Sequence, residues 1–151
     1  SISTIGEQAN DDCAHSVISA NNRYVVFDSI ANSLVIEDRN NQADVFIRDL
    51  DLGTTEYISI SSGETQGNGP SGAGVTSAPM GVEGFAISEN GRYVVFSSKA
   101  TTLLTNDTNG KEDVFLRDRL EGTTIRVSCT PDGVSADLST RGFWPLTSSK
   151  L

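Results

Sequence analysis

The side chains whose chemistry is easiest to name lie in one short loop and are Asp107, Asn109 and Asp113. Carboxylate and amide oxygens closely spaced around a tight turn are the ligands that Ca²⁺ takes in proteins, and Gly110 permits such a turn. A backbone carbonyl and water would complete the coordination. The match is incomplete, because no bidentate glutamate stands in the right place and the Asp-x-Asp-x-Asp-Gly spacing is not met. The pattern therefore indicates a candidate Ca²⁺ site.

An earlier loop with the same arrangement offers a second, weaker candidate in Asp38, Asn40 and Asp44. Asn41 stands there in place of the glycine. The alternative for both loops is structural, because Asp and Asn side chains often accept backbone N–H groups and so cap turns. The sequence leaves both interpretations open, and Ca²⁺ is the one cofactor that it suggests.

Other reactive groups are sparse. His15 is the only histidine and has no identifiable partner, so the sequence gives no Ser-His-Asp arrangement. Cys13 and Cys129 could form one bridge, but their unlike contexts favour two free thiols. Paired carboxylates in a channel could support glycoside chemistry, although nothing locates them. We therefore assign no catalytic and no cofactor-binding residue.

The charge balance argues against two classes of partner. Eleven basic and 20 acidic side chains give the 151-residue chain a net charge of −9, whereas nucleic acids and anionic membranes attract clustered Lys and Arg. No apolar run approaches the roughly 20 residues that span a bilayer, and no basic, apolar leader opens the sequence. Because the first residue is Ser1, a leader could already have been removed, and the protein would then be periplasmic or secreted.

An internal repeat must position these groups. Residues 18–59 align without a gap to residues 87–128, with Arg92 standing 69 positions after Arg23 and roughly half of the positions identical. The first copy opens with ISANNRYVVFDS and the second with ISENGRYVVFSS. Self-similarity at a fixed period is the signature of a repeat architecture.

Each copy predicts four antiparallel strands in sequence. Asn-Gly at 90–91 and Asn-Asn at 21–22 predict a hairpin turn in which both central residues have positive φ. In the two copies the first predicted strand ends near residue 19 or 88, the second covers residues 23–27 or 92–96, and the third covers residues 44–49 or 113–118. The fourth predicted strand follows a Gly-Thr-Thr turn and ends at Ile60 or Cys129. No segment has a helical pattern. The sequence therefore predicts an all-β protein.

The central strands are apolar on both faces. Tyr24 and Val26 lie on one face, and Val25 and Phe27 lie on the other. A sheet with one solvated face would alternate apolar with polar residues, so both faces of these sheets must be covered. Face-to-face stacking of the copies provides that cover.

The Arg-Asp dipeptides at 48–49 and 117–118 are also repeated. Adjacent residues on a strand point to opposite faces, so the two members of each dipeptide cannot pair with each other. We expect each arginine to bridge to a carboxylate of the neighbouring copy, which is a structural role.

The runs ISENGRYVVFSS, DTNGKEDVFLRD and GTTIRVS resemble the TolB-like β-propeller repeats of bacterial proteins. The resemblance covers about 42 residues in each copy. It implies two four-stranded antiparallel propeller blades, in a family whose rings typically have six. It does not imply one function, because the same blade serves unrelated activities.

Three segments depart from the repeat. Residues 1–6 resemble residues 128–133, so we expect the chain to begin on the tail of a strand whose own blade is missing. That segment, with Ile2 as a candidate interface residue, could complete a blade of a neighbouring subunit or mark a piece of a longer array. Residues 67–83 form a Gly-, Pro- and Ser-rich loop, either a lid or a neutral insertion. The tail at 138–151 carries Phe143 and Trp144, which we expect to cover a blade face or to anchor an interface.

We therefore expect a single domain over residues 1–151, with blade one at about 12–62 and blade two at about 84–133. Two blades cannot close a ring of the usual four to eight. Self-association, for example three chains forming six blades, would complete it; the chain could instead be a fragment, or the loop and the tail could act as caps. The expected function is a non-enzymatic scaffold for protein or ligand binding. The alternatives are a hydrolase or lyase that uses carboxylates of a propeller channel, and a structural fragment of a longer propeller protein.

Overall fold

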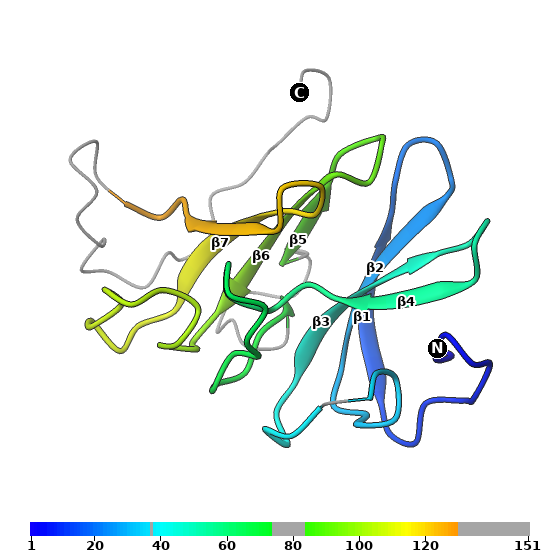
Figure 1. Cartoon of the computed structure of the whole chain (residues 1–151), viewed down its shortest axis with the longest axis horizontal. Coiled ribbons are helices and arrows are strands. Elements are labelled where there is room, and N and C mark those ends of the chain that lie inside the picture. The colour runs from blue at the N-terminus through cyan, green and yellow to red at the C-terminus, as the bar shows by residue number, and fades with distance from the viewer. Residues whose placement is uncertain (37, 74–83, 130–151) are drawn as a thin grey trace.

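Two antiparallel β-sheets make up the protein in a computed structural model, which describes residues 1–36, 38–73 and 84–129. In each sheet the strands follow one another in sequence order, and the described residues contain no helix. The first sheet comprises β1 (Cys13–Ile18), β2 (Tyr24–Ser29), β3 (Asp44–Asp49) and β4 (Thr54–Tyr57). The second comprises β5 (Phe85–Ile87), β6 (Tyr93–Ser98), β7 (Asp113–Asp118) and β8 (Thr123–Arg126). The predicted all-β class is confirmed, and the sheets lie beside each other (Figure 1).

The two sheets share one register. Phe27 pairs with Phe46 between β2 and β3, and Phe96 pairs with Phe115 between β6 and β7. Both phenylalanine pairs stack with ring centroids 5.7 Å apart. The repeat seen in the sequence is therefore repeated in the packing of side chains.

The fourth strands are shorter than predicted. They end at Tyr57 and Arg126 instead of at Ile60 and Cys129. The backbone N–H groups of Ile58 and Ser59 both turn to the carbonyl of Val45, which ends the regular ladder.

The hairpin turns also differ from the prediction. Asn22 (φ 59°) and Gly91 (φ 70°) are the only residues of the two turns with positive φ. The N–H of Asn22 donates to the carbonyl of Ser19 at 2.9 Å, so an ordinary reverse turn is followed by one left-handed residue. Asn21 contributes its side chain, which accepts the N–H of Arg23 at 3.0 Å.

The core lies between the sheets. We call the face of each sheet that carries Tyr24, Val26 and Ile47, or their repeat equivalents, the front face, and the opposite one the back face. The front face of the first sheet packs against the back face of the second. The larger buried residues of this core include Val26, Val45, Ile47, Ile58, Phe85, Val94, Phe96 and Phe115. The expected face-to-face stacking of the copies is thus present.

A smaller cluster covers the back face of the first sheet. Phe27, Ala31, Leu34 and Phe46 are buried there, and Ala9 of the N-terminal segment packs against them. The chain's first residues lie beside β4 (Figure 1). One end of this outer face is therefore covered from within the chain.

The close approach of the two sheets depends on one glycine. A Cβ atom at Gly91 would lie 2.4 Å from the nearest ring carbon of Tyr24. Arg119, in the turn after β7, closes the same contact: its guanidinium lies 5.3 Å from the centre of the Tyr24 ring and donates to the Gly91 carbonyl at 2.7 Å. Tyr24 is therefore held between Gly91 and Arg119 of the other sheet.

We expect Gly91→Ala to destabilise the fold more than Gly110→Ala does. Both glycines have positive φ, so both substitutions carry the cost of a left-handed alanine, about 1–2 kcal/mol. Only at Gly91 does the new methyl group meet another side chain, because Gly110 has no atom within 4 Å of its Cβ position. The clash should add about 1–3 kcal/mol in urea unfolding. Equal losses would show that the sheets do not pack at this distance.

Candidate functional site

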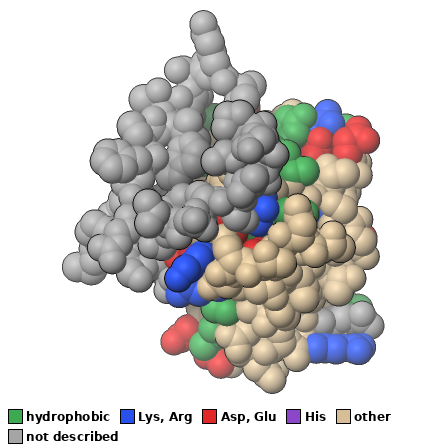
Figure 2. All heavy atoms as spheres, turned by 90° about the vertical axis from the view of Figure 1, so that its left-hand side faces the viewer, with side chains coloured by type: hydrophobic (Ala, Val, Ile, Leu, Met, Phe, Trp, Pro, Cys, Tyr) green, Lys and Arg blue, Asp and Glu red, His purple; other side chains and the backbone are tan. Residues whose placement is uncertain are grey.

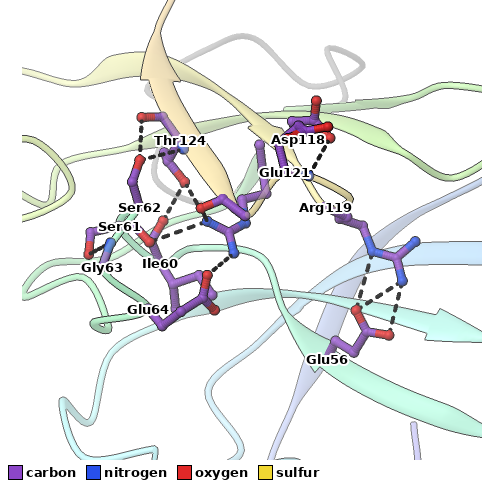
Figure 3. A network of polar contacts seen from close by, with 12 residues as sticks. Glu56, Ile60, Ser61, Ser62, Gly63, Glu64, Asp118, Arg119, Glu121 and Thr124 are labelled. Carbon is purple, nitrogen blue, oxygen red and sulfur yellow. Dashed lines mark hydrogen bonds and ion pairs between the residues drawn. The ribbon is translucent and has the colours of Figure 1, made fainter.

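The segment that follows the first sheet docks on the second sheet through Thr124. The N–H of Thr124 donates to the Ser62 hydroxyl at 2.9 Å, and its own hydroxyl donates to the Ile60 carbonyl at 2.6 Å. Arg117 donates to the Ser61 carbonyl at 3.2 Å. Figure 3 shows these contacts around Thr124. Residues 60–68 thereby fix the first sheet to the outer half of the second.

The N-terminal segment repeats these contacts on the first sheet. The N–H of Thr55 donates to the Thr4 hydroxyl at 2.9 Å, and its hydroxyl donates to the Ile2 carbonyl at 2.7 Å. Arg48 donates to the Ser3 carbonyl at 3.1 Å. Residues 1–10 therefore occupy the place on the first sheet that residues 60–68 occupy on the second. Ile2, an expected interface residue, makes its contact here through its backbone.

The two arginines of the predicted Arg-Asp dipeptides differ in their partners. Arg117 is buried and forms an ion pair with Glu64, from the segment that follows the first sheet. This contact agrees with the expected bridge between copies. At the equivalent place beside Arg48 the chain has Gly6, and among the described residues Arg48 donates to the Ser3 carbonyl and the Thr55 hydroxyl.

The aspartates of these dipeptides pair within their own sheets, which the sequence reading missed. Arg23 holds Asp49 through two nitrogens at 2.8–3.2 Å, and Arg92 holds Asp118 in the same way at 2.7–3.1 Å. These hydrogen bonds lower the pKa of both carboxyls to about 2. The signal was present, because both members of each pair recur at the repeat offset.

A polar groove opens where the sheets diverge at their outer strands. It consists of two hollows of about 550 and 480 Å³ that share Tyr57, Ile60 and Glu64. On one side Arg119 crosses to Glu56 of β4 with nitrogen–oxygen distances of 2.9–3.3 Å (Figure 3). Each glutamate that lines the groove is thus paired with an arginine.

No family model matches this chain, and neither does any curated protein. Within the described part of the chain, no helix is long and apolar enough to cross a membrane.

The second acidic loop encloses a side-chain cation. The Nη1 atom of Arg126 lies 3.7 Å from Asp107 and 3.6 Å from Asp113, and all three side chains are almost fully buried. Asn109 donates to Asp113 at 3.2 Å. Burial, and then the charge of Asp113, raise the pKa of Asp107, while Arg126 opposes this rise.

The first acidic loop has amides where the second has an arginine. Gln66 donates to Asp38 at 2.9 Å and to Asp44 at 3.0 Å, and Asn40 donates to Asp44 at 2.9 Å. Tyr57 occupies the repeat position of Arg126 and bonds to Gln66. Burial raises the pKa of the Asp44 carboxyl to about 6. Burial and the two carboxylates also raise the pKa of Tyr57.

The asparagines of both loops cap turns. Asn40 accepts the N–H of Gln42 at 2.7 Å, and Asn109 accepts the N–H of Lys111 at 2.8 Å. Among the described residues, no group of three or more His, Cys, Asp or Glu side chains is arranged to hold a metal ion. The structure brings each predicted set of residues together, but in contacts that favour the capping interpretation. The Ca²⁺ interpretation of the two loops is tested by the thermal melt described below.

His15 has a partner that the sequence did not reveal. Its Nδ1 atom lies 3.2 Å from Asp28, and its backbone N–H donates to the same carboxylate at 2.9 Å. The backbone N–H of Ala73 also donates to Asp28 at 3.0 Å. Asp28 thus joins β1 to the start of the 67–83 loop. Cys13 and Cys129 are both free and exposed, as the sequence favoured.

Two further predicted segments are described only in part or not at all. Residues 67–73, the beginning of the predicted lid or insertion, are packed: Ser71 is buried and bonds to Ser98 at 2.8 Å. The remainder of that loop at 74–83, and the interface candidates Phe143 and Trp144, lie outside the described residues.

We expect added Ca²⁺ to leave the thermal midpoint unchanged relative to a chelator. In the second loop an incoming cation would face the charge of Arg126, and in the first loop the amide of Gln66 already bonds to both carboxylates. A specific site filled at 100 times its Kd would stabilise the fold by about 2.7 kcal/mol. A midpoint raised by Ca²⁺, but not by the same ionic strength of NaCl, would show that one of the loops binds it.

We expect the stability advantage of the wild type over Asp44→Asn to shrink as pH rises from 4 to 7. The folded-state pKa of Asp44, about 6, lies above its ordinary value of 3.8. Between these values the folded state holds a proton that the unfolded state has lost, so ionisation destabilises the fold, by up to about 3 kcal/mol. Asparagine cannot ionise. Urea unfolding at each pH measures the difference.

Asp49→Asn is the matched control with the opposite sign. Because its folded-state pKa is lowered to about 2, Asp49 stabilises the fold above pH 4, and this contribution is lost as pH falls toward 2. The advantage over Asp49→Asn should therefore stay constant from pH 5 to 7. An advantage over Asp44→Asn that grew with pH would contradict the assignment.

Proposed function

We propose that the protein is a non-enzymatic scaffold of the β-propeller type, which assembles with further copies and binds a protein or other ligand on the surface so formed. One observation carries the proposal. Residues 60–68 and residues 1–10 grip successive sheets through equivalent contacts at Thr124 and Thr55. The architecture therefore consists of one recurring unit, a docking segment followed by a sheet, and the packing of one such sheet on the next is not specific to two units.

Two four-stranded meanders stacked face to face match the blade arrangement implied by the resemblance to TolB-like repeats. Three chains would supply six blades. The groove between the sheets, with its alternating Glu56, Arg119, Glu64 and Arg117, is the polar surface that such an assembly would offer to a ligand.

The contacts of three carboxylates, Asp44, Asp49 and Asp118, support a scaffold over a hydrolase. Asp49 and Asp118 each bind an arginine, and Asp44 receives hydrogen bonds from Ser59, Gln66 and Asn40. Each of these groups is occupied in holding strands or loops together. A general acid or base must instead reach a substrate proton.

The proposal is tested by the mass of the protein in solution. We expect sedimentation velocity over a range of concentrations to show a species of more than one chain, with the fraction rising with concentration. A single species of about 16.0 kDa at all concentrations would reject assembly and would favour the structural-fragment alternative.

A further inference from the structure

The front face of the second sheet is apolar and incompletely covered. Its residues at the repeat positions of the buried core are Val95, Leu116 and Val127. Ile58 in the first sheet is 1% exposed, whereas Val127, its equivalent, is 38% exposed. Figure 2 views the molecule from the left-hand side of Figure 1, and its described hydrophobic side chains form small patches among polar side chains and backbone. This face is built like one that packs on another sheet.

The back face of the first sheet has the complementary character. Ile18 and Leu50 are exposed there, and Val25 is only partly buried. Their equivalents on the back face of the second sheet include Val94, which is fully buried against the first sheet. Each outer face therefore shows apolar residues at the positions that the inner contact buries.

One pair of residues indicates that the two outer faces fit each other. Inside the chain, Glu56 on the front face meets Arg119 at the back of the next sheet. The repeat equivalent of Glu56 is Ile125, and the equivalent of Arg119 is Leu50. Both are 52% exposed. Where the inner contact has an ion pair, the two outer faces thus have one apolar residue each. If only one of the two positions had changed, a charged side chain would face an apolar one.

We infer that the front face of the second sheet binds the back face of the first sheet of another copy, head to tail, with Ile125 against Leu50. This inference rests on the proposed assembly and names the surface that performs it. The occupant is a second copy because the chain itself carries both halves of the matched pair, and because the contact continues the one already present between its sheets.

The rest of the outer back face leaves room for this partner. The back face of the second sheet is contacted both by residues 60–68 and by the front face of the first sheet, so the two contacts do not exclude each other. On the first sheet, residues 1–10 already fill the place of residues 60–68. A partner therefore needs to bring only its sheet.

The fit between copies is looser than the inner one at a single place. Gly91, against which Tyr24 packs, is replaced at the outer back face by Asn22, and Tyr24 is replaced by Tyr93. Any Cβ at the position of Gly91 comes within 2.4 Å of the tyrosine ring. Tyr93 of the partner must therefore turn aside from Asn22, which weakens the contact between copies relative to that between sheets.

Sedimentation velocity on Ile125→Glu, Leu50→Arg and the double variant tests the pairing. Each single change sets a charge against an apolar side chain, and we expect the dissociation constant to rise about tenfold or more. The double variant recreates the Glu-Arg pair at every contact, whatever the number of copies, and should restore most of the association.

Leu120→Glu and Leu52→Arg are the matched controls. Both leucines are exposed. Each substitution introduces the same charge as the test variant that it matches, within a few residues of the test position. Their repeat equivalents, Asp51 and Glu121, are exposed and form ion pairs with Arg23 and Arg92 of their own sheets. We expect the controls to assemble like the wild type.

Asn22→Gly provides a test that gains association. Glycine accepts the positive φ of this turn, and it removes the Cβ that Tyr93 must avoid, so we expect the dissociation constant to fall severalfold. An oligomer that the single variants leave intact, or that the double variant does not restore, would overturn the inference while leaving the proposed assembly standing. A wild type of one-chain mass would overturn both.

Discussion

The fold depends on sheets that are apolar on both faces. A four-stranded meander of this kind cannot be solvated on either side without exposing rows of Val, Ile and Phe. In this chain the front face of the first sheet packs on the back face of the second, and this contact buries Val26, Ile47 and Ile58. Two of the four sheet faces are thereby removed from solvent. The remaining features of the molecule either fix the distance of that contact or deal with the faces that it leaves over.

Polar groups give the apolar contact its geometry. Hydrophobic burial is non-directional, so it does not by itself specify how two sheets are rotated or spaced. The ring of Tyr24 against Gly91 sets the spacing, while Arg119 fixes the outer edge through Glu56. The docking segments at Thr55 and Thr124 then hold each sheet to the chain that precedes it. Burial thus supplies the stability, and a small number of hydrogen bonds supplies the arrangement.

Much of this was readable from the sequence, because repetition doubles every local signal. Two copies of RYVVF and of DVF-x-RD placed the central strands, and apolar residues on both pleat faces predicted stacking. The contacts that the sequence did not predict depend on the register between strands or on residues distant in the chain. The pairing of Arg23 with Asp49 requires knowledge of which residues of β2 and β3 are opposite.

The acidic loops show the same limit at the candidate site. Asp107 and Asp113 look like free oxygen ligands until β8 brings Arg126 between them. In the first copy the equivalent residue is Tyr57, so one of two loops that are alike in sequence contacts a cation and the other contacts neutral amide and hydroxyl groups. A pattern of ligand-type residues therefore predicts which groups come together, but it does not predict what else arrives with them.

The two faces of each sheet are different surfaces, and this has a consequence for any assembly that uses them. A contact between unlike faces cannot be satisfied by a two-fold pair, because each new member brings one used face and one unused face. Growth therefore stops only when the rotation from sheet to sheet brings the last face back to the first. Small changes in the angle between neighbouring sheets would then decide between a closed particle of fixed size and an open filament, even if the strength of each contact stayed the same.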